Sequence, residues 1–170
     1  MLLEIIDLDK LRRGILYTII MLVVLTLQEM VLSRISLFGV KAFIVPIFPV
    51  AVAVLQGGWW GLGFSLACGM LCDTMLAETR VLFTMLLPAL AFMATAAEKF
   101  LISRRLVAVF AAAVCALFIT AFMQGLRVVV LYDAQLLPVL RSALLQVIYG
   151  IPFIFPIYLA CRALSERALD

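Results

Sequence analysis

Histidine is absent from this chain, and charged residues are scarce, since Asp, Glu, Lys and Arg together make up 14% of it. The absence of histidine removes the most frequent general base and metal ligand in proteins. The sequence contains no Walker motif, dinucleotide-binding fingerprint or nucleophile elbow. We therefore predict that the protein is not an enzyme and uses no cofactor. Its net charge of +3 does not indicate a nucleic-acid partner.

Cysteine offers no alternative chemistry in this sequence. Cys68 and Cys72 are four residues apart, so they share a helix face, but consecutive turns of one helix give poor disulfide geometry. No histidine or paired carboxylate completes a ligand set for a metal. The cysteines are therefore predicted to act as small, buried packing residues.

Long apolar runs dominate what is present, because hydrophobic residues make up 67% of the chain. A helix needs about 20 mostly apolar residues to cross a bilayer. The runs span 14–32, 41–55, the stretch from Gln56-Gly57-Gly58 to about Leu76, 81–97, 106–126 and 144–161. The sequence thus predicts an all-α, polytopic membrane bundle of about six transmembrane helices.

The domain organisation follows from these runs. Residues 14–162 form the transmembrane domain, and residues 163–170 form a short tail. Residues 1–13 are an N-terminal segment, for which an interfacial helix and a disordered tail both remain open. Within the second run, Pro46 and Pro49 predict a kinked or broken helix whose freed carbonyl groups need partners from neighbouring segments.

Six crossings place both termini on the same side of the membrane. Eight basic residues then share the face that carries the termini: Lys10, Arg12, Arg13, Lys99, Arg104, Arg105, Arg162 and Arg167. The other five lie on the opposite face: Arg34, Lys41, Arg80, Arg127 and Arg141. Because cytoplasmic loops carry more Lys and Arg, both termini are predicted to be cytoplasmic.

The third run contains the most specific pattern. Gly57, Gly61, Ser65, Gly69 and Asp73 follow one another at intervals of four residues. On a helix they form a groove of small side chains that ends at a carboxylate, and such grooves let a second helix approach closely. Packing inside the chain's own bundle and contact with another membrane protein are both open interpretations.

Asp73 is expected to need a partner, because an ionised carboxylate at membrane depth is costly. Glu29 and Arg127 fall at similar depth in their own runs. We predict that Asp73 pairs with Arg127 or another arginine of that side, forming a polar cluster with Glu29. This cluster is either a patch that recognises a partner or ligand, or a structural ion pair that sets helix register.

Several of these features resemble the bacterial rod shape-determining MreD family. The residues that carry the resemblance are Leu27-Gln28, Phe38-Gly39-Val40-Lys41, Gly69 to Asp73, Gln146 to Pro152 and Pro156 to Arg162. The resemblance implies a non-catalytic scaffold of the cell-elongation machinery in the bacterial cytoplasmic (inner) membrane. The implied partners are an MreC-like membrane protein and, through it, MreB and RodA with its transpeptidase. Gly61, Ser65 and Gly69 would then receive the single MreC helix.

A second interpretation is the substrate-binding membrane component of an energy-coupling factor vitamin transporter, which is similar in size, apolarity and number of spans. The run 14–32 lacks the alanine ladder with which such components dock on their transporter. The outer loops also look too short and aliphatic to cap a polar vitamin. A lipid-handling enzyme ranks last, because it needs more buried acids or a histidine.

Overall fold

A computed structural model describes residues 2–32, 34, 36–37, 40–75, 82–101, 105–132 and 135–167. Within these residues the chain forms six α-helices, one π-helical segment and one antiparallel two-stranded hairpin. The elements are α1 (Leu2–Leu27), η1 (Gln28–Leu32), β1 (Ser36–Leu37), β2 (Val40–Lys41), α2 (Ile47–Gln56), α3 (Gly58–Met75), α4 (Leu82–Leu101), α5 (Arg105–Tyr132) and α6 (Leu136–Arg167). Arg80, Arg104, the Phe38–Gly39 pair and residues 168–170 of the tail lie outside the described residues.

The predicted all-α bundle is confirmed within the described residues. Three helical stretches are long and apolar enough to cross a membrane, namely Leu11–Leu32, Leu106–Leu131 and Leu136–Ser165. They contain 22, 26 and 30 residues, which correspond to about 33, 39 and 45 Å of helix. The helices α5 and α6 are therefore longer than the runs 106–126 and 144–161 indicated.

The N-terminal segment is not a separate element. Residues 2–13 form the first turns of α1, which continues without a break into the apolar stretch. Residues 2–13 are thus helical and continuous with the apolar part of α1, and a position at the membrane interface stays a prediction.

The second predicted span is not a continuous helix. Residues 42–44 have no regular secondary structure, Val45 and Pro46 form a turn, and α2 begins only at Ile47. Pro49 lies in the first helical turn, where its missing N–H costs no intrahelical hydrogen bond. The break that the two prolines predicted is thus confirmed. The helical part of this run has ten residues and is about 15 Å long, so α2 alone is too short to cross a bilayer.

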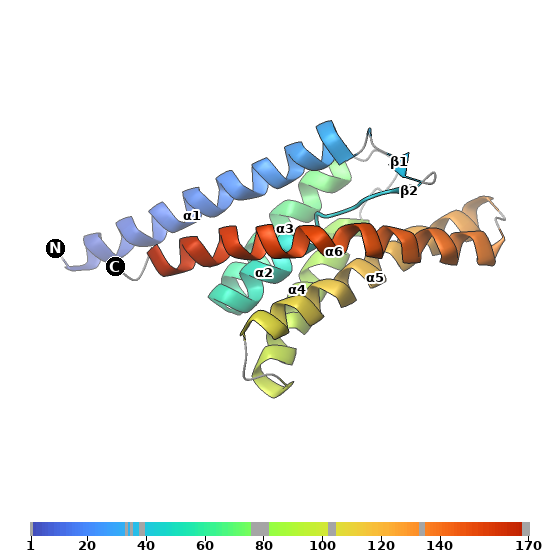
Figure 1. Cartoon of the computed structure of the whole chain (residues 1–170). Helices are drawn as coiled ribbons and strands as arrows, with labels where there is room; N and C mark the ends of the chain where they lie inside the picture. The colour runs from blue at the N-terminus through green and yellow to red at the C-terminus, as the bar shows by residue number, and fades with distance from the viewer. Residues whose placement is uncertain are drawn as a thin grey trace.

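The short helix α2 occupies the centre of the molecule. Every residue from Ile47 to Val54 is buried, and α2 packs against α3, α4, α5 and α6. A helix that is apolar on all sides is expected where water is excluded, either in a protein core or in lipid, and α2 lies in the core. The long helices lie outside it, and Figure 1 shows α1, α5 and α6 running along the same general direction.

A buried glutamine holds the chain segment that leads into α2. The side chain of Gln28 in η1 is 7% exposed; its Nε2 donates to the carbonyl oxygen of Ala42 at 2.9 Å. Its Oε1 accepts a hydrogen bond from the backbone N–H of Ile44, also at 2.9 Å. The side-chain amide of Gln28 therefore supplies the hydrogen bonds that a neighbouring strand would otherwise give to the Ala42 carbonyl and the Ile44 N–H, which belong to no helix.

A second buried contact sets the register of α1 against α6. The Tyr17 hydroxyl donates to the carbonyl oxygen of Cys161 at 3.3 Å and accepts a hydrogen bond from Gln56 Nε2 at 2.9 Å. Tyr17 is 1% exposed. This contact brings the early part of α1 next to the late part of α6, so that the beginning of α1 and the end of α6 lie at the same end of the bundle (Figure 1).

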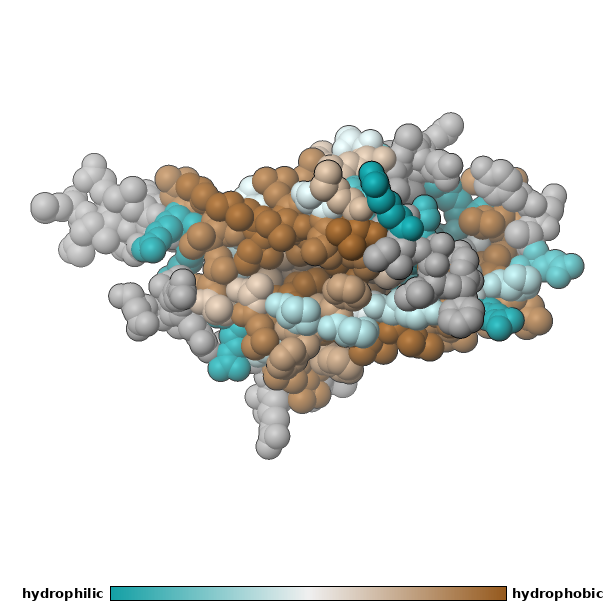
Figure 2. Space-filling model, turned by 45° about the horizontal axis from the view of Figure 1, so that its top comes forward, coloured by the Kyte–Doolittle hydropathy of each residue, from teal (hydrophilic) through white to brown (hydrophobic). Residues whose placement is uncertain are grey.

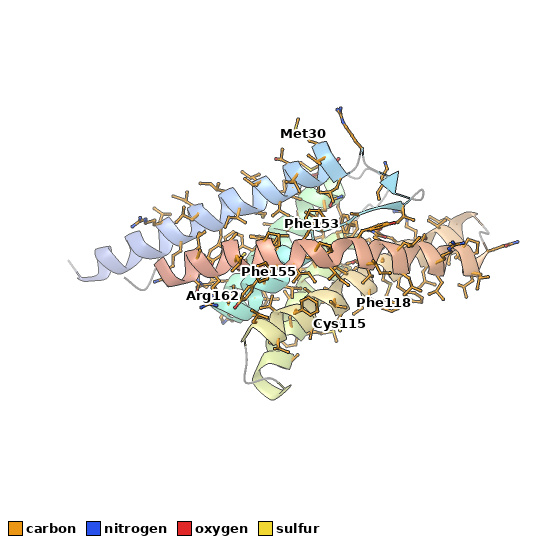
Figure 3. The ribbon with its side chains drawn as sticks, viewed as in Figure 1. Met30, Cys115, Phe118, Phe153, Phe155 and Arg162 are labelled. Atoms are coloured by element: carbon orange, nitrogen blue, oxygen red, sulfur yellow. The ribbon has the colours of Figure 1, made fainter. Side chains whose placement is uncertain are left out.

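Apolar side chains cover the outside of the bundle as well as its interior. Met30, Phe118 and Phe155, which are labelled in Figure 3, are 66%, 41% and 61% exposed. In Figure 2 brown, hydrophobic residues spread over the middle of the visible face, with most teal residues toward its left and right ends. Such a surface is suited to hydrocarbon rather than water.

Replacing Gln28 with methionine is expected to destabilise the protein selectively. The substitution keeps the side-chain volume but leaves the Ala42 carbonyl and the Ile44 N–H buried without this partner, at a cost of about 1–3 kcal/mol each. Thermal unfolding in detergent measures the loss, and faster hydrogen exchange at the Ile44 amide localises it. The control is Gln135→Met, because Gln135 is exposed. Equal melting temperatures for Gln28→Met and the wild type would contradict the role assigned to Gln28.

Candidate functional site

The small residues of the third run lie at the junction of α3 with α2 and α4. Gly57 is not part of α3 but ends α2, with a φ of 92° that favours glycine. Its N–H donates to the carbonyl oxygen of Ala53 at 3.1 Å, and its own carbonyl accepts from the N–H of Gly61 at 3.1 Å. The chain therefore reverses sharply between two packed helices.

Gly61 and Gly69 permit two close helix contacts. A Cβ atom at Gly61 would overlap the Cα and Cβ atoms of Ala53 in α2. A Cβ atom at Gly69 would lie 2.5 Å from the carbonyl oxygen of Phe83 and 2.8 Å from the Cα atom of Thr84, both in α4. Only glycine lets these backbones approach so closely, as in other tightly packed membrane helices.

Ser65 lies between these contacts and is also covered. Its side chain is 0% exposed, and its hydroxyl donates to the carbonyl oxygen of Leu62, one turn earlier, at 2.9 Å. The groove that Gly61, Ser65 and Gly69 form is thus filled by α2 and α4 of the same chain. The expectation that this groove receives a partner's helix is not met, because no face of it is open.

Asp73 binds the beginning of α4. Its side chain is 9% exposed; Oδ1 accepts from the N–H of Phe83 at 3.1 Å. Oδ2 accepts from both the N–H and the hydroxyl of Thr84, each at 2.7 Å. The first N–H groups of a helix have no intrahelical partner and carry partial positive charge. A carboxylate from α3 therefore caps α4, a role usually played by a residue of the capped helix's own N-terminus.

The predicted polar cluster of Asp73, Glu29 and Arg127 is not held together by direct bonds. Glu29 lies half-buried in η1, and Arg127 lies half-buried in the last third of α5. Across the described part of the chain, no hydrogen bond or ion pair joins any two of these three residues. The expected pairing of Asp73 with Arg127 is thus corrected, because the donors at the start of α4 take the carboxylate instead.

Sequence reasoning missed the partners of two polar residues. The sequence does not predict that Thr84, the third residue of α4, binds Asp73. The only local signal is a threonine near the start of an apolar run, where helices often begin. The role of Gln28 was also missed, since nothing in the local pattern indicates that its amide binds a segment 14 to 16 residues further along.

A shallow apolar groove of about 390 Å³ lies on the outer side of α3. Trp59 is 90% exposed, and the ring of Trp60 stacks on that of Phe64 at a centroid distance of 6.1 Å. This position agrees with anchoring at a membrane interface. The groove is lined by Trp59, Trp60, Gly63, Phe64 and Ala67.

The α2–α3–α4 junction is a structural joint built from small residues and one capping carboxylate. No family model, curated protein or solved structure matches this chain. The described contacts hold helices together. What they show is close helix packing and a capped helix N-terminus.

Glycines 61 and 63 form a matched pair for testing the joint. Gly61→Ala is expected to destabilise the protein by about 1–3 kcal/mol, because the added methyl group overlaps Ala53 and overpacks the core. Gly63→Ala is expected to be neutral or slightly stabilising, since no other atom lies within 4 Å of the added Cβ. Thermal unfolding of both variants in detergent decides the matter. Identical melting temperatures would show that the α2–α3 contact is looser than described.

Replacing Asp73 with asparagine tests the cap on α4. The amide keeps one acceptor oxygen but turns an NH₂ group toward N–H donors, so we expect a loss of about 1–3 kcal/mol. Thr84→Val removes only the hydroxyl contact and should cost less, whereas Thr84→Ser should stay close to the wild type. Thermal unfolding ranks the three variants. A stable Asp73→Asn protein that loses activity in cells would instead favour a recognition role for the carboxylate.

Proposed function

We propose that this protein is a non-enzymatic membrane scaffold of the bacterial cell-elongation machinery. In this role it binds an MreC-like membrane protein and, through it, couples MreB to peptidoglycan synthesis by RodA and its transpeptidase. The proposal rests on the resemblance to the MreD family, and the contacts described above give the residues of that resemblance a physical purpose.

The observation that carries the proposal is the role of the resembling residues in the fold. Gln28 binds the segment that follows Val40 and Lys41. Gly69 and Asp73 bring α3 against the start of α4. Residues that hold a bundle together are expected to recur in a family whose members act as scaffolds, because the surfaces that they position are what partners bind.

The filled interior of the bundle also supports the proposal that the protein is a scaffold. The centre of the bundle is occupied by α2, whose buried residues Ile47 to Val54 are all apolar. A binding component for small molecules needs a pocket with a few convergent polar groups. A scaffold needs a rigid body with recognisable outer surfaces, and dense packing around a central helix provides rigidity.

We further propose six crossings with both termini in the cytoplasm of a bacterial cell. The helices α1, α3, α4, α5 and α6 supply five crossings. The sixth combines residues 42–44, the turn at Val45 and Pro46, and α2, which together reach at most about 30 Å. Eight of the 13 basic residues then lie on the cytoplasmic side.

The vitamin-transporter interpretation has less support. The groove beside Trp59 and Trp60 is lined by apolar side chains and lies on the outer side of α3. It offers a polar vitamin no convergent hydrogen-bonding groups, so we retain this interpretation only as the alternative outcome of the experiment.

Conditional depletion of the protein in its native host tests the proposed function. We expect rod-shaped cells to swell and become round before growth stops, because lateral wall synthesis loses its scaffold. Phase-contrast microscopy with a fluorescent wall label measures both changes. A plasmid-borne wild-type copy serves as the control and should restore the rods. Unchanged cell shape, with growth rescued by an added vitamin, would overturn the proposal in favour of the transporter component.

A further inference from the structure

The connection between α5 and α6 carries an exposed aliphatic tip. We define the hairpin tip as residues 128–132 of α5 and residues 135–140 up to and into α6, the two residues between them lying outside the described part. Figure 1 shows this end of α5 and α6 extending past the other helices. Its exposed large side chains are Val128, Val130, Leu131, Leu136, Leu137 and Leu140, of which Leu137 is 80% exposed.

Arginines mark the same helix length in three separate elements. Arg105 and Arg127 are 22 residues apart in α5, and Arg141 and Arg162 are 21 residues apart in α6. Arg13 in α1 and Arg34 after η1 are also 21 residues apart. Within α5 and α6, which are continuous helices, such a spacing corresponds to about 32 Å, close to the hydrocarbon thickness of a bilayer, and arginines prefer its two boundaries.

Contacts between the helices place these arginines in two levels. Tyr17 of α1 bonds to Cys161 of α6, which puts Arg13 and Arg162 at one end. A Cβ at Gly125 of α5 would lie 2.5 Å from a methyl carbon of Val139 in α6, which puts Arg127 and Arg141 at the other. Arg13, Arg127, Arg141 and Arg162 therefore lie at two levels, which α6 separates by the length of helix between Arg141 and Arg162.

The hairpin tip lies just beyond the second level. Tyr132 is five residues past Arg127, and Leu137 is four residues before Arg141, which is about 6–8 Å of helix. The headgroup layer on each side of a bilayer is roughly 5–8 Å thick. The length of the tip thus matches the headgroup layer and does not reach far into water.

The outer surface of α5 and α6 continues into the tip. Met123 and Leu144 lie on the side of Arg127 and Arg141 that faces the middle of the bundle, and their side chains are 40% and 48% exposed. The aliphatic side chains of the tip, beyond the arginines, are also exposed. A second copy that covered the same tip would bring the Arg127 and Arg141 side chains of both copies into one interface, where like charges repel one another. Lipid fits both observations, because acyl chains and headgroups can cover the continuous apolar surface while lipid phosphates bind Arg127 and Arg141.

We propose that the α5–α6 hairpin tip is a lipid-binding element that inserts its aliphatic side chains into the headgroup layer. Arg127 and Arg141 contact lipid phosphates at the base of the tip, on the side of the membrane opposite the N-terminus. At the edge of the bundle formed by α3 and α4, the described parts of these helices have 18 and 20 residues. The protein therefore presents a longer apolar surface to lipid on one edge than on the other, which is expected to thicken and thin the bilayer locally.

Tryptophan placed at single positions tests the depth of the tip. Both native tryptophans are replaced, giving a Trp59→Phe, Trp60→Phe background in the full chain. Leu137→Trp then reports on the tip, and the matched control Leu144→Trp reports on the part of α6 between the two arginine levels. The proteins are reconstituted in vesicles of dioleoyl phosphatidylcholine and phosphatidylglycerol. Quenching by brominated phosphatidylcholine and by aqueous iodide is measured for each.

We expect Leu137→Trp to be quenched by the brominated lipid at least about half as strongly as Leu144→Trp, with iodide quenching well below that of free tryptophan. Full iodide quenching without lipid quenching would place the tip in water, as for a surface that docks a partner protein, and would overturn the proposal. Protection from both quenchers would indicate cover by a second copy and would also overturn it.

The arginine contacts are tested in the same vesicles. Adding Arg127→Gln and Arg141→Gln is expected to reduce lipid quenching of Leu137→Trp by about half or more while leaving Leu144→Trp unchanged. Lysine at both positions should preserve the quenching, because it keeps the charge. Unchanged quenching in the glutamine variant would overturn the anchoring role of these arginines. The assay uses no partner protein, so its result is independent of the proposed cellular function.

Discussion

The peptide groups between Lys41 and Ile47 impose the constraint on which the rest of the fold depends. They are extended or in a turn, yet Phe43, Ile44 and Val45 are at most 6% exposed, so water cannot satisfy them. In an apolar medium each unsatisfied N–H or carbonyl group costs several kcal/mol. Gln28 provides one donor and one acceptor for this segment, which lets the chain enter the core without a helix.

The central position of α2 follows from that entry. Because the chain arrives extended and Pro46 precedes the first helical turn, α2 is short and begins inside the bundle. Its apolar surface is covered by α3, α4, α5 and α6. The glycines of α3 serve the same end. They set the distance to α2 at Gly61 and to α4 at Gly69, where a larger side chain would separate the helices.

The outer surface serves a different purpose from the joint. The long helices expose aliphatic and aromatic side chains over most of their length, with arginines near both ends. Burial thus divides the protein into a packed interior, which the joint holds together, and an apolar exterior. The proposed scaffold would use both parts, since partners recognise surfaces whose geometry is constant.

By itself the sequence determined the class of the protein and the places where its helices stop. Apolar runs of sufficient length predict membrane helices, Pro46 and Pro49 predict the break before α2, and the interval of four residues from Gly61 to Gly69 predicts one groove on α3. Each of these properties depends on neighbours along the chain. Only the tertiary structure decided that α2 and α4 fill the groove, that Asp73 caps α4 instead of pairing with Arg127, and that Gln28 binds Ala42 and Ile44. Those outcomes depend on which elements meet in space, and a hydrogen-bonding side chain is satisfied by any donor or acceptor of suitable geometry, which local sequence patterns do not specify.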